Sequence, residues 1–376
     1  MRMHPRKHCQ CRDLGVGRAG TSACQVFIIL AHQREGKHSC VPPRVAFVCL
    51  AILLSACGRY SDFTLPAVPG GNPDFTFAFQ SKPDPVIPRG QGWESSDVLN
   101  PSVVRLDDNV LMNLYSGFDG HTWHTGLATS EDGQTWNRKG KVLSPDPKTW
   151  EAGYIAANGS ILVHDGQPMY WYVAGPRERP RLGLARSDDF RNWRKEPLPV
   201  LEPGPYASWD EYGVADPYVI RIDPYFYLYY LGQDRARRQR LGVARSKDGV
   251  RWEKLRTNPI LELGDPGAFD EAGLGEPAVW QSNLYYWMLY TGRDLHENRR
   301  MGLARSTDGV HWTKTALVLG GGNLWDAKVV CDPTVLFEGG IVRVWFGGGD
   351  VASPDENLHG QIGYGTLEPV GAKLTK

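Results

Sequence analysis

The chain has 376 residues, 41% of them hydrophobic and 11% aromatic, which is typical of a globular protein. Its 42 basic residues balance 42 acidic ones, but eight basic and two acidic residues lie in the first 56, which leaves 34 basic (42 − 8) and 40 acidic (42 − 2) residues in the body. An acidic body gives no electrostatic basis for nucleic-acid binding, and the sequence has no phosphate-binding glycine loop, Cys-x-x-Cys pair or His-Glu-x-x-His motif.

The first 57 residues are expected to target the protein rather than to fold with it. Residues 45–56 are apolar, too short for the ~20 residues that cross a bilayer as a helix but suited to a signal peptide. The run ends in Leu54-Ser55-Ala56-Cys57, which resembles a bacterial lipobox and predicts lipidation at Cys57. Six of the seven cysteines lie here, so a disulfide framework in the body is excluded.

We therefore expect residues 1–56 to comprise a signal peptide and an upstream segment that precedes the true start codon near Val41, followed by a linker over residues 57–73. The mature protein would be lipid-anchored in the bacterial cell envelope, either periplasmic or surface-exposed. A plain secretory signal, and thus a secreted protein, is the alternative.

Five copies of one unit follow. An aromatic residue and an acid recur 56 to 60 residues apart, at Trp93-Glu94, Trp150-Glu151, Trp209-Asp210, Phe269-Asp270 and Trp325-Asp326. Each pair precedes two runs of β-branched and aromatic residues, a small-residue segment such as LGVARS and a turn such as SKDGVRW, which indicates four short strands per unit. Four-stranded units repeated radially form a β-propeller. The sequence predicts an all-β, five-bladed propeller over residues 74–370, with four antiparallel strands per blade.

The fifth copy lacks an outer strand, because the chain ends soon after Gly365. Residues 74–88 match the pattern of the outer-strand segments 193–203 and 252–263. We expect this N-terminal segment to complete blade five and close the ring, which would remove an open sheet edge.

Two of the recurring motifs are interpreted as architectural. The Ser-x-Asp-(Gly/Phe)-x-x-Trp turns of blades one to four resemble the Asp boxes of sialidases, in which the Asp caps a hairpin and the Trp packs between blades. The aromatic-acid pairs recur in every blade, which favours a structural role, with the tryptophans as sugar platforms in the alternative interpretation.

A third recurring position changes its chemistry around the ring. It opens the innermost strand of each blade and is occupied by Asn100, Asn158, Asp216, Glu276 and Asp332. We expect these side chains to converge on the central channel, where three carboxylates would repel one another and raise at least one pKa. A protonated carboxyl beside an ionised carboxylate is what glycosidic cleavage requires. Capping of backbone amides at the blade starts is the alternative.

These features resemble the five-bladed propeller glycoside hydrolases of families 43, 62, 32, 68, 117 and 130. The resemblance covers residues 74–368 and rests on Ala215-Asp216-Pro217, Gly275-Glu276-Pro277, Cys331-Asp332-Pro333 and the Gly-Leu-Ala-Arg-Ser tracts. Family 43 has Asp, Asp and Glu in its first three blades, whereas this chain has Asp, Glu and Asp in blades three to five. The resemblance implies a glycosidase that acts on arabinan-, xylan- or fructan-like saccharides.

The positions of the three acidic residues around the ring suggest a catalytic role for each. Glu276 is the candidate general acid, because two acidic neighbours would hold its proton, and either Asp216 or Asp332 would activate water. We expect inversion, for which acid and base stand about 6.5–9.5 Å apart.

The loops after the second strand of each blade are expected to complete the mouth and to bind the sugar by stacking and charge-assisted hydrogen bonds. With Asn100 and Asn158, the candidate binding residues are His121, Trp123, His124, Arg177, Asp234, Arg235, Arg293, Asp294, His296 and Asp350. Asp119, Asp234, Asp294 and Asp350 share one repeat position, so capping of their own loops explains them equally well. No cofactor or metal is predicted; metal ligation by His121 and His124, or a channel Ca²⁺ as in relatives, is the alternative.

Two other functions stay open. The basic tracts 177–181, 235–240 and 298–300 could hold phosphate, as in phosphorylases of the family 130 kind, and a carbohydrate-binding propeller without catalysis is the third reading. In each case we expect a monomer with a carbohydrate ligand, no nucleic-acid partner, and membrane contact only through the lipid anchor.

Overall fold

The computed structural model describes residues 60–70, 76–106 and 110–370. The predicted signal peptide, the upstream segment and Cys57 lie outside these described residues. The described chain is almost entirely β-structure, with two short 3-10 turns, η2 (Gly92–Glu94) and η3 (Leu324–Asp326). None of the described residues belongs to a helix with the length and hydrophobicity of a membrane span.

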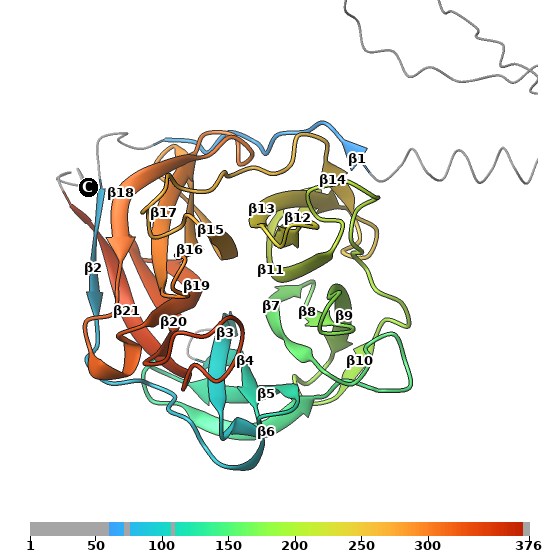
Figure 1. Cartoon of the computed structure of the whole chain (residues 1–376), viewed down its shortest axis with the longest axis vertical. Helices are drawn as coiled ribbons and strands as arrows, with labels where there is room; N and C mark the ends of the chain where they lie inside the picture. The colour runs from blue at the N-terminus through green and yellow to red at the C-terminus, as the bar shows by residue number, and fades with distance from the viewer. Residues whose placement is uncertain (1–59, 71–75, 107–109, 371–376) are drawn as a thin grey trace, which may run out of the picture. The chain divides into compact units, whose positions relative to one another are not determined.

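Five four-stranded antiparallel sheets are arranged as a ring, with the first strand of each sheet innermost (Figure 1). Blade one consists of β3 (Asp97–Leu106), β4 (Val110–Phe118), β5 (Trp123–Ser130) and β6 (Asn137–Leu143), and blade two of β7 (Ala156–His164), β8 (Gln167–Ala174), β9 (Arg181–Ser187) and β10 (Trp193–Lys195). Blade three consists of β11 (Gly213–Ile222), β12 (Tyr225–Gln233), β13 (Gln239–Ser246) and β14 (Glu253–Leu255), and blade four of β15 (Gly273–Ser282), β16 (Tyr285–Arg293), β17 (Arg299–Ser306) and β18 (Thr313–Leu319). Blade five consists of β19 (Val329–Glu338), β20 (Ile341–Gly349), β21 (Gln361–Val370) and β2 (Thr76–Ser81). The predicted five-bladed propeller is confirmed.

Burial along the strands follows their place in the blade. The second strands, such as β12 with the sequence YFYLYYLGQ, are buried along nearly their whole length, because neighbouring blades cover both of their faces. The outer strand β6 instead alternates between exposed and partly buried residues, as expected of a strand with one face in water.

Blade five is closed by the N-terminal strand, as predicted. Strand β2 pairs antiparallel with β21, from Thr76 opposite Val370 to Ser81 opposite Gly365. The buried side chain of Phe77 packs edge-on against Trp280 and Trp287 of blade four, with ring centroids 5.9 and 5.1 Å apart. A strand that precedes blade one in the sequence is thus paired within blade five, where it covers the edge of β21.

Residues 60–70 of the predicted linker pack on the propeller. Strand β1 (Tyr60–Ser61) pairs in parallel with β14, and Leu65 and Val68 are buried in the core shared by blades three and four. The Leu65 N–H donates to the carbonyl of Asp308 at 2.8 Å. This segment therefore contacts both blade three and blade four and connects them.

The Asp boxes are architectural, as predicted. In blade one, Asp132 Oδ1 accepts the N–H groups of the two residues that follow Gly133, at 2.8 and 2.7 Å. The Gly133 carbonyl accepts from the indole of Trp136 in its own hairpin and from that of Trp345 in blade five, at 3.1 and 2.6 Å. Blades three and four repeat the interblade bond, at the carbonyls of Gly249 and Gly309. These turns join neighbouring blades.

Replacing Phe77 by Ala tests how much strand β2 contributes to closing the propeller ring. It removes a buried ring that connects the N-terminal strand to blade four, and we expect the free energy of unfolding to fall by about 3–5 kcal/mol. Denaturant unfolding measures the loss, with the exposed Leu324→Ala as the control, which should change stability by less than about 0.5 kcal/mol. Equal stability of the two variants would mean that the N-terminal strand contributes little to closing the ring.

Candidate active site

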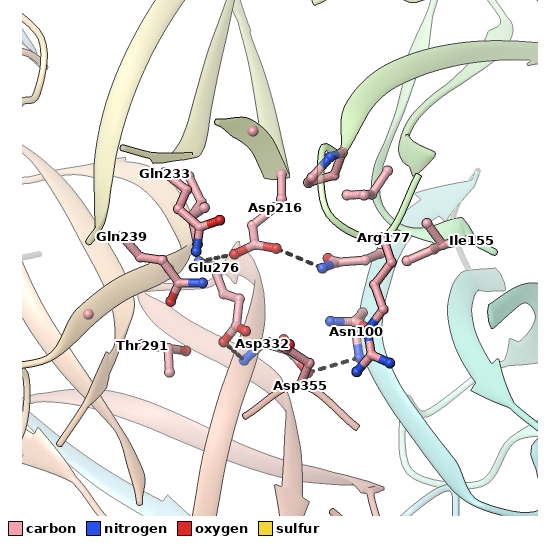
Figure 2. A pocket seen from close by; sticks show the side chains of 18 of the residues that line it. Asn100, Ile155, Arg177, Asp216, Gln233, Gln239, Glu276, Thr291, Asp332 and Asp355 are labelled. Carbon is pink, nitrogen blue, oxygen red and sulfur yellow. Dashed lines mark hydrogen bonds between the residues drawn. The ribbon is translucent and has the colours of Figure 1, made fainter. Parts of the chain in front are cut away.

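Each innermost strand carries a β-bulge at the position that the sequence singles out. The residues there have positive φ angles of 48 to 52°, and they are Asn100, Asn158, Asp216, Glu276 and Asp332. Asn and Asp tolerate this left-handed conformation, whereas a glutamate there is unusual. A bulge redirects its side chain, and Figure 2 shows Asp216, Glu276 and Asp332 turned toward one another. The predicted convergence is confirmed.

Hydrogen bonds link these residues from blade to blade. The N–H of Glu276 donates to Asp216 Oδ2 at 3.2 Å, that of Asp332 to Glu276 Oε2 at 3.0 Å, and that of Asn100 to Asp332 Oδ2 at 3.3 Å. Asn158 donates through its side-chain amide to Asp216 Oδ1 at 2.7 Å. The carboxylates therefore accept hydrogen bonds from the amides of the next blade and also converge on the channel. Amide capping and convergence, given as alternatives from the sequence, are both correct.

Burial and mutual repulsion perturb the two aspartates. The exposed fractions of Asp216 and Asp332 are 8% and 5%, whereas Glu276 is only half-buried. Burial first, and then the charge of Glu276, raises the pKa of Asp216 to about 7. The same two causes raise the pKa of Asp332 well above its ordinary value. Asp216 and Asp332 thus hold their protons more tightly than isolated aspartates do.

Two neighbouring side chains interact with the three carboxyl groups of Asp216, Glu276 and Asp332, here called the trio. The thiol of Cys331 donates to Asp332 Oδ2 at 3.1 Å, and burial raises the pKa of this thiol so that it keeps its proton. Arg299 is buried beside these carboxyl groups; burial lowers its pKa, but the surrounding negative charge, that of Glu276 first, outweighs this and raises it, so the guanidinium stays cationic. Arg299 therefore offsets part of the negative charge of the site.

The trio faces a cavity of about 230 Å³. Residues from every blade line it, and the predicted ones among them are Asn100, Trp123, Asn158, Arg177, Asp216, Glu276, Arg293 and Asp332. Its wall combines carboxylates, amides and guanidinium groups with the ring of Trp123, a composition that suits a polar ligand with an apolar face.

The other predicted binding residues do not line this cavity, and they are His121, His124, Asp234, Arg235, Asp294, His296 and Asp350. The loop aspartates are engaged in their own turns: Asp234 accepts the N–H of Ala236 at 2.9 Å and Asp294 that of His296 at 2.8 Å. Asp350 lies 2.8 Å from the ring of His359. Of the two interpretations of these aspartates, capping of the loop is the one that the geometry supports at Asp234 and Asp294.

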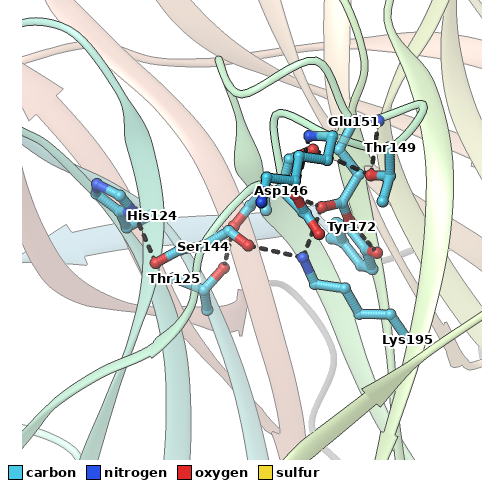
Figure 3. A network of polar contacts seen from close by, with 10 residues as sticks. His124, Thr125, Ser144, Asp146, Thr149, Glu151, Tyr172 and Lys195 are labelled. Carbon is cyan, nitrogen blue, oxygen red and sulfur yellow. Dashed lines mark hydrogen bonds and ion pairs between the residues drawn. The ribbon is translucent and has the colours of Figure 1, made fainter.

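His124 belongs to a different environment, shown in Figure 3. It is buried, and its Nδ1 lies 3.0 Å from the hydroxyl of Ser144. In the same network the buried Glu151 accepts from Tyr172 at 2.7 Å and pairs with Lys195 at 2.6 Å. Blades three and four repeat this acid, tyrosine and lysine arrangement at Asp210, Tyr230 and Lys254 and at Asp270, Tyr290 and Lys314.

The aromatic partners of these acids are also structural. The indole of Trp93 fills the space above Gly117 and Gly126, and that of Trp209 fills the space above Gly232 and Gly242. None of the five aromatics lines the 230 Å³ cavity. The aromatic-acid pairs therefore hold strands together within each blade.

The sequence reasoning missed several cavity residues, namely Tyr154, Gln233, Arg237, Gln239, Arg299 and Asp355. Arg237 and Arg299 lie in the basic tracts 235–240 and 298–300, but a run of basic residues alone does not show which arginine lines the cavity. Asp355 lies in the loop that follows β20, which is longer than the corresponding loops of the other blades, so no repeat position pointed to this residue.

That loop of blade five is held against the cavity at several points. The buried Asp97 accepts the N–H groups of Asn357 and Gly360 at 2.6 and 2.7 Å. Glu356 accepts from the hydroxyl of Tyr154 at 2.7 Å and pairs with Arg177 at 2.9 Å. The wall that contains Asp355 is therefore positioned by blades one and two as well as by its own blade.

Among the described residues, one group could offer three metal ligands: Glu276, Cys331 and Asp332, whose ligand atoms lie within 4.8 Å of one another. The charge of Arg299 already compensates this group. A proton held between Glu276 and Asp332 would likewise reduce the negative charge of this group.

Comparison with known proteins identifies the family of this chain. The profile of the glycosyl hydrolases family 32 N-terminal domain matches residues 112–255 and 179–326, which together span more than half of the chain. The chain belongs to this family. The two matches end after the outer strands of blades three and four, so they are displaced by one blade, as internal repeats allow.

Two proteins are similar in sequence. An uncharacterized protein of Mycobacterium tuberculosis (strain H37Rv) is 31% identical over 232 residues, covering 56% of this chain and 75% of that protein. A 1,2-β-oligomannan phosphorylase of Thermoanaerobacter sp. (strain X514) is 28% identical over 156 residues, covering 40% of this chain and 48% of that enzyme.

Solved structures share the fold. A β-1,2-mannobiose phosphorylase from Listeria innocua superposes with a TM-score of 0.62 at 11% identity, covering 77% of this chain and 96% of that one. A structure from the family 130 mannoside phosphorylases, described as including hydrolases of β-1,2 mannosidic linkages in Candida mannan, gives 0.60 at 19% identity, covering 81% and 96%. The family and the fold identify a glycan-active enzyme.

The raised pKa of Asp216 predicts a pH-dependent stability. A carboxyl that holds its proton more tightly when folded stabilises the protein fully at low pH, and this contribution is lost as the pH rises from about 4 through about 7. Asp216→Asn should therefore show a smaller loss of unfolding free energy between pH 4 and pH 8 than the wild type. Urea unfolding across this range measures it, with the exposed Asp84→Asn as control. Identical slopes in all three proteins would contradict the assignment.

Proposed function

We propose that the protein hydrolyses a glycosidic bond with Glu276 as the general acid, Asp332 as the group that shares its proton, and Asp216 as the base that activates water. The observation that carries the proposal is the set of three hydrogen-bonded carboxyl groups, from blades three to five, that line one cavity. A glycosidic bond is cleaved by one protonated and one ionised carboxyl group.

Glu276 is suited to deliver the proton. It is the most accessible of the three and lines the cavity, so it can reach the oxygen of a bound sugar. Asp332 lies deeper, and its Oδ1 is buried with no hydrogen-bond partner among the described residues. Burial and the charge of Glu276 raise the pKa of Asp332 well above its ordinary value, so Asp332 can hold a proton beside Glu276 and pass it to the acid.

Asp216 is the better base of the two aspartates. Glu276 and Asp332 have ligand atoms within 4.8 Å of each other, which is short of the ~6.5–9.5 Å that leaves room for a water molecule between acid and base. Asp216 flanks Glu276 on the other side, and with its pKa near 7 it ionises close to neutral pH. With Asp216 as base, the reaction inverts the configuration of the sugar.

The cavity suggests action at a chain end. Its volume of about 230 Å³ is below the ~300–1,000 Å³ typical of sites for drug-sized ligands, so it suits one terminal sugar unit rather than the middle of a chain. Because a relative is a 1,2-β-oligomannan phosphorylase, β-1,2-mannooligosaccharides are the first substrates to test, followed by arabinan, xylan and fructan oligosaccharides.

Phosphorolysis is the second candidate, favoured by that relative and by the arginines of the cavity. These arginines already have protein partners: Arg177 pairs with Glu356 at 2.9 Å, Arg237 with Glu178 at 2.7 Å, and Arg299 donates to the carbonyl of Ser353 at 3.2 Å. A phosphate would have to displace them, which favours water as the nucleophile. Turnover should therefore be the same with and without inorganic phosphate, and a sugar phosphate among the products would establish the phosphorylase instead.

Replacing Glu276 by Gln keeps the shape of the side chain but removes the transferable proton, and we expect the turnover number to fall by about 10²–10⁴-fold. Glu368→Gln makes the same chemical change on the exposed face of β21 and should keep wild-type turnover. Product release from an oligosaccharide panel measures both. An active Glu276→Gln enzyme would refute the role of this residue.

We also propose that the mature protein is anchored to the cell envelope by a lipid on Cys57, on the strength of the Leu-Ser-Ala-Cys sequence. Metabolic labelling with a fatty acid should mark the wild-type protein and not Cys57→Ala. No label in either protein would support a plain secretory signal, and equal label in both would place the lipid on another residue.

A further inference from the structure

A second depression lies outside the cavity on blade three. It measures about 520 Å³, and the residues that matter here are Tyr206, Glu211, Asp234 and Arg235. The ring of Tyr206 is 78% exposed, although an aromatic side chain usually buries most of its surface. We propose that Tyr206 and Arg235 form an outer subsite, which binds a further sugar unit of the glycan whose end occupies the cavity. This inference rests on the proposed function.

The aromatic ring is held in place before any ligand arrives. The Arg235 guanidinium carbon stands 4.4 Å from the ring centroid of Tyr206, and its Nη1 donates to the Tyr206 hydroxyl at 3.3 Å. The Nε of Arg235 pairs with the buried Glu211 at 3.0 Å. The other oxygen of Glu211 accepts the N–H of Ala207 at 2.6 Å. Ala207 has a φ of 66°, a conformation that alanine adopts only under strain.

Blade four shows that the fold does not require Tyr206 or Arg235. Sixty residues further along the repeat, Pro266 replaces Tyr206 and Leu295 replaces Arg235. The turn is nevertheless the same, because the N–H of Gly267 donates to Glu271 at 2.8 Å. At the strained position blade four uses a glycine with a φ of 88°, which relieves the strain that blade three keeps at Ala207. The tyrosine and arginine of blade three are therefore additions to a turn that forms without them.

One loop separates the depression from the cavity. Along residues 233–240, Gln233, Arg237 and Gln239 line the cavity, whereas Asp234, Arg235 and Arg238 line the depression. A glycan that extends from the cavity across this wall reaches the exposed face of Tyr206. A tyrosine ring stacks on the apolar face of a sugar, and the guanidinium of Arg235 can donate to its hydroxyl groups. The occupant is thus an inner sugar unit of the same substrate chain.

The test is a chain-length series. Kinetics of the wild type, Tyr206→Ala and Arg235→Leu are measured on oligosaccharides of two to six units of a glycan that the wild type cleaves. Leu295→Ala, 72% exposed at the equivalent place in blade four, is the matched control. We expect Tyr206→Ala to raise KM for the longer substrates by roughly three- to tenfold relative to the disaccharide, while the control follows the wild type. Thermal unfolding confirms that all variants are folded.

Equal KM ratios between long and short substrates in Tyr206→Ala and the wild type would overturn the subsite while the proposed function stands. If the wild type cleaves no glycan in the panel, the proposed function fails, and calorimetric binding of the same oligosaccharides decides the subsite. Weaker binding by Tyr206→Ala than by the wild type would support it. Equal binding, or no binding to the wild type, would overturn it.

Discussion

Three carboxyl groups from neighbouring blades are linked by a row of hydrogen bonds from backbone amides, because each innermost strand bulges at the residue that carries the carboxyl. The bulge turns the side chain out of the sheet and toward the channel, where it meets the amide of the next blade. The same contact that joins two blades therefore places Asp216, Glu276 and Asp332 beside one another. The geometry of the three carboxyl groups and the contact between their blades thus depend on the same hydrogen bonds.

This arrangement holds like charges close together, and the surrounding structure must offset their repulsion. Burial raises the pKa of Asp216 and of Asp332, so that the trio retains protons instead of carrying three negative charges. Arg299 contributes a buried positive charge, and the thiol of Cys331 donates a hydrogen bond from below. The closed ring supplies the rigidity, since β2 ties blade five to the start of the propeller.

The repeats made the architecture readable from the sequence. Each blade must build the same four strands, so the aromatic-acid pairs, the Asp boxes and the position of Glu276 recur at nearly constant spacing. The closure by residues 74–88 followed from the missing strand of the fifth copy. The position of the trio was predictable for the same reason, because its members occupy one place in the repeat.

Features that do not recur from blade to blade could not be predicted from the sequence in this way. In the tract 235–240 the path of the loop, and not the run of basic residues, places Arg237 at the cavity and Arg235 at the depression outside it. Asp234 and Asp294 looked like binding residues, but local turns use their oxygens. Asp355 lies in a loop that is longer in blade five than in the other blades, and the segment around Leu65 has no strand-like pattern in its sequence. Such positions depend on loop conformation rather than on periodicity.

The most direct test of the account is a carboxyl-carbon NMR titration of the protein labelled at aspartate and glutamate. The account predicts one aspartate signal that titrates near pH 7 and is lost in Asp216→Asn, and a second that titrates well above the ordinary range of an aspartate and is lost in Asp332→Asn. Each replacement should also shift the titration of the remaining signal. If every carboxyl group titrated below pH 5, the trio would hold no shared proton and the proposed acid catalysis would have no source.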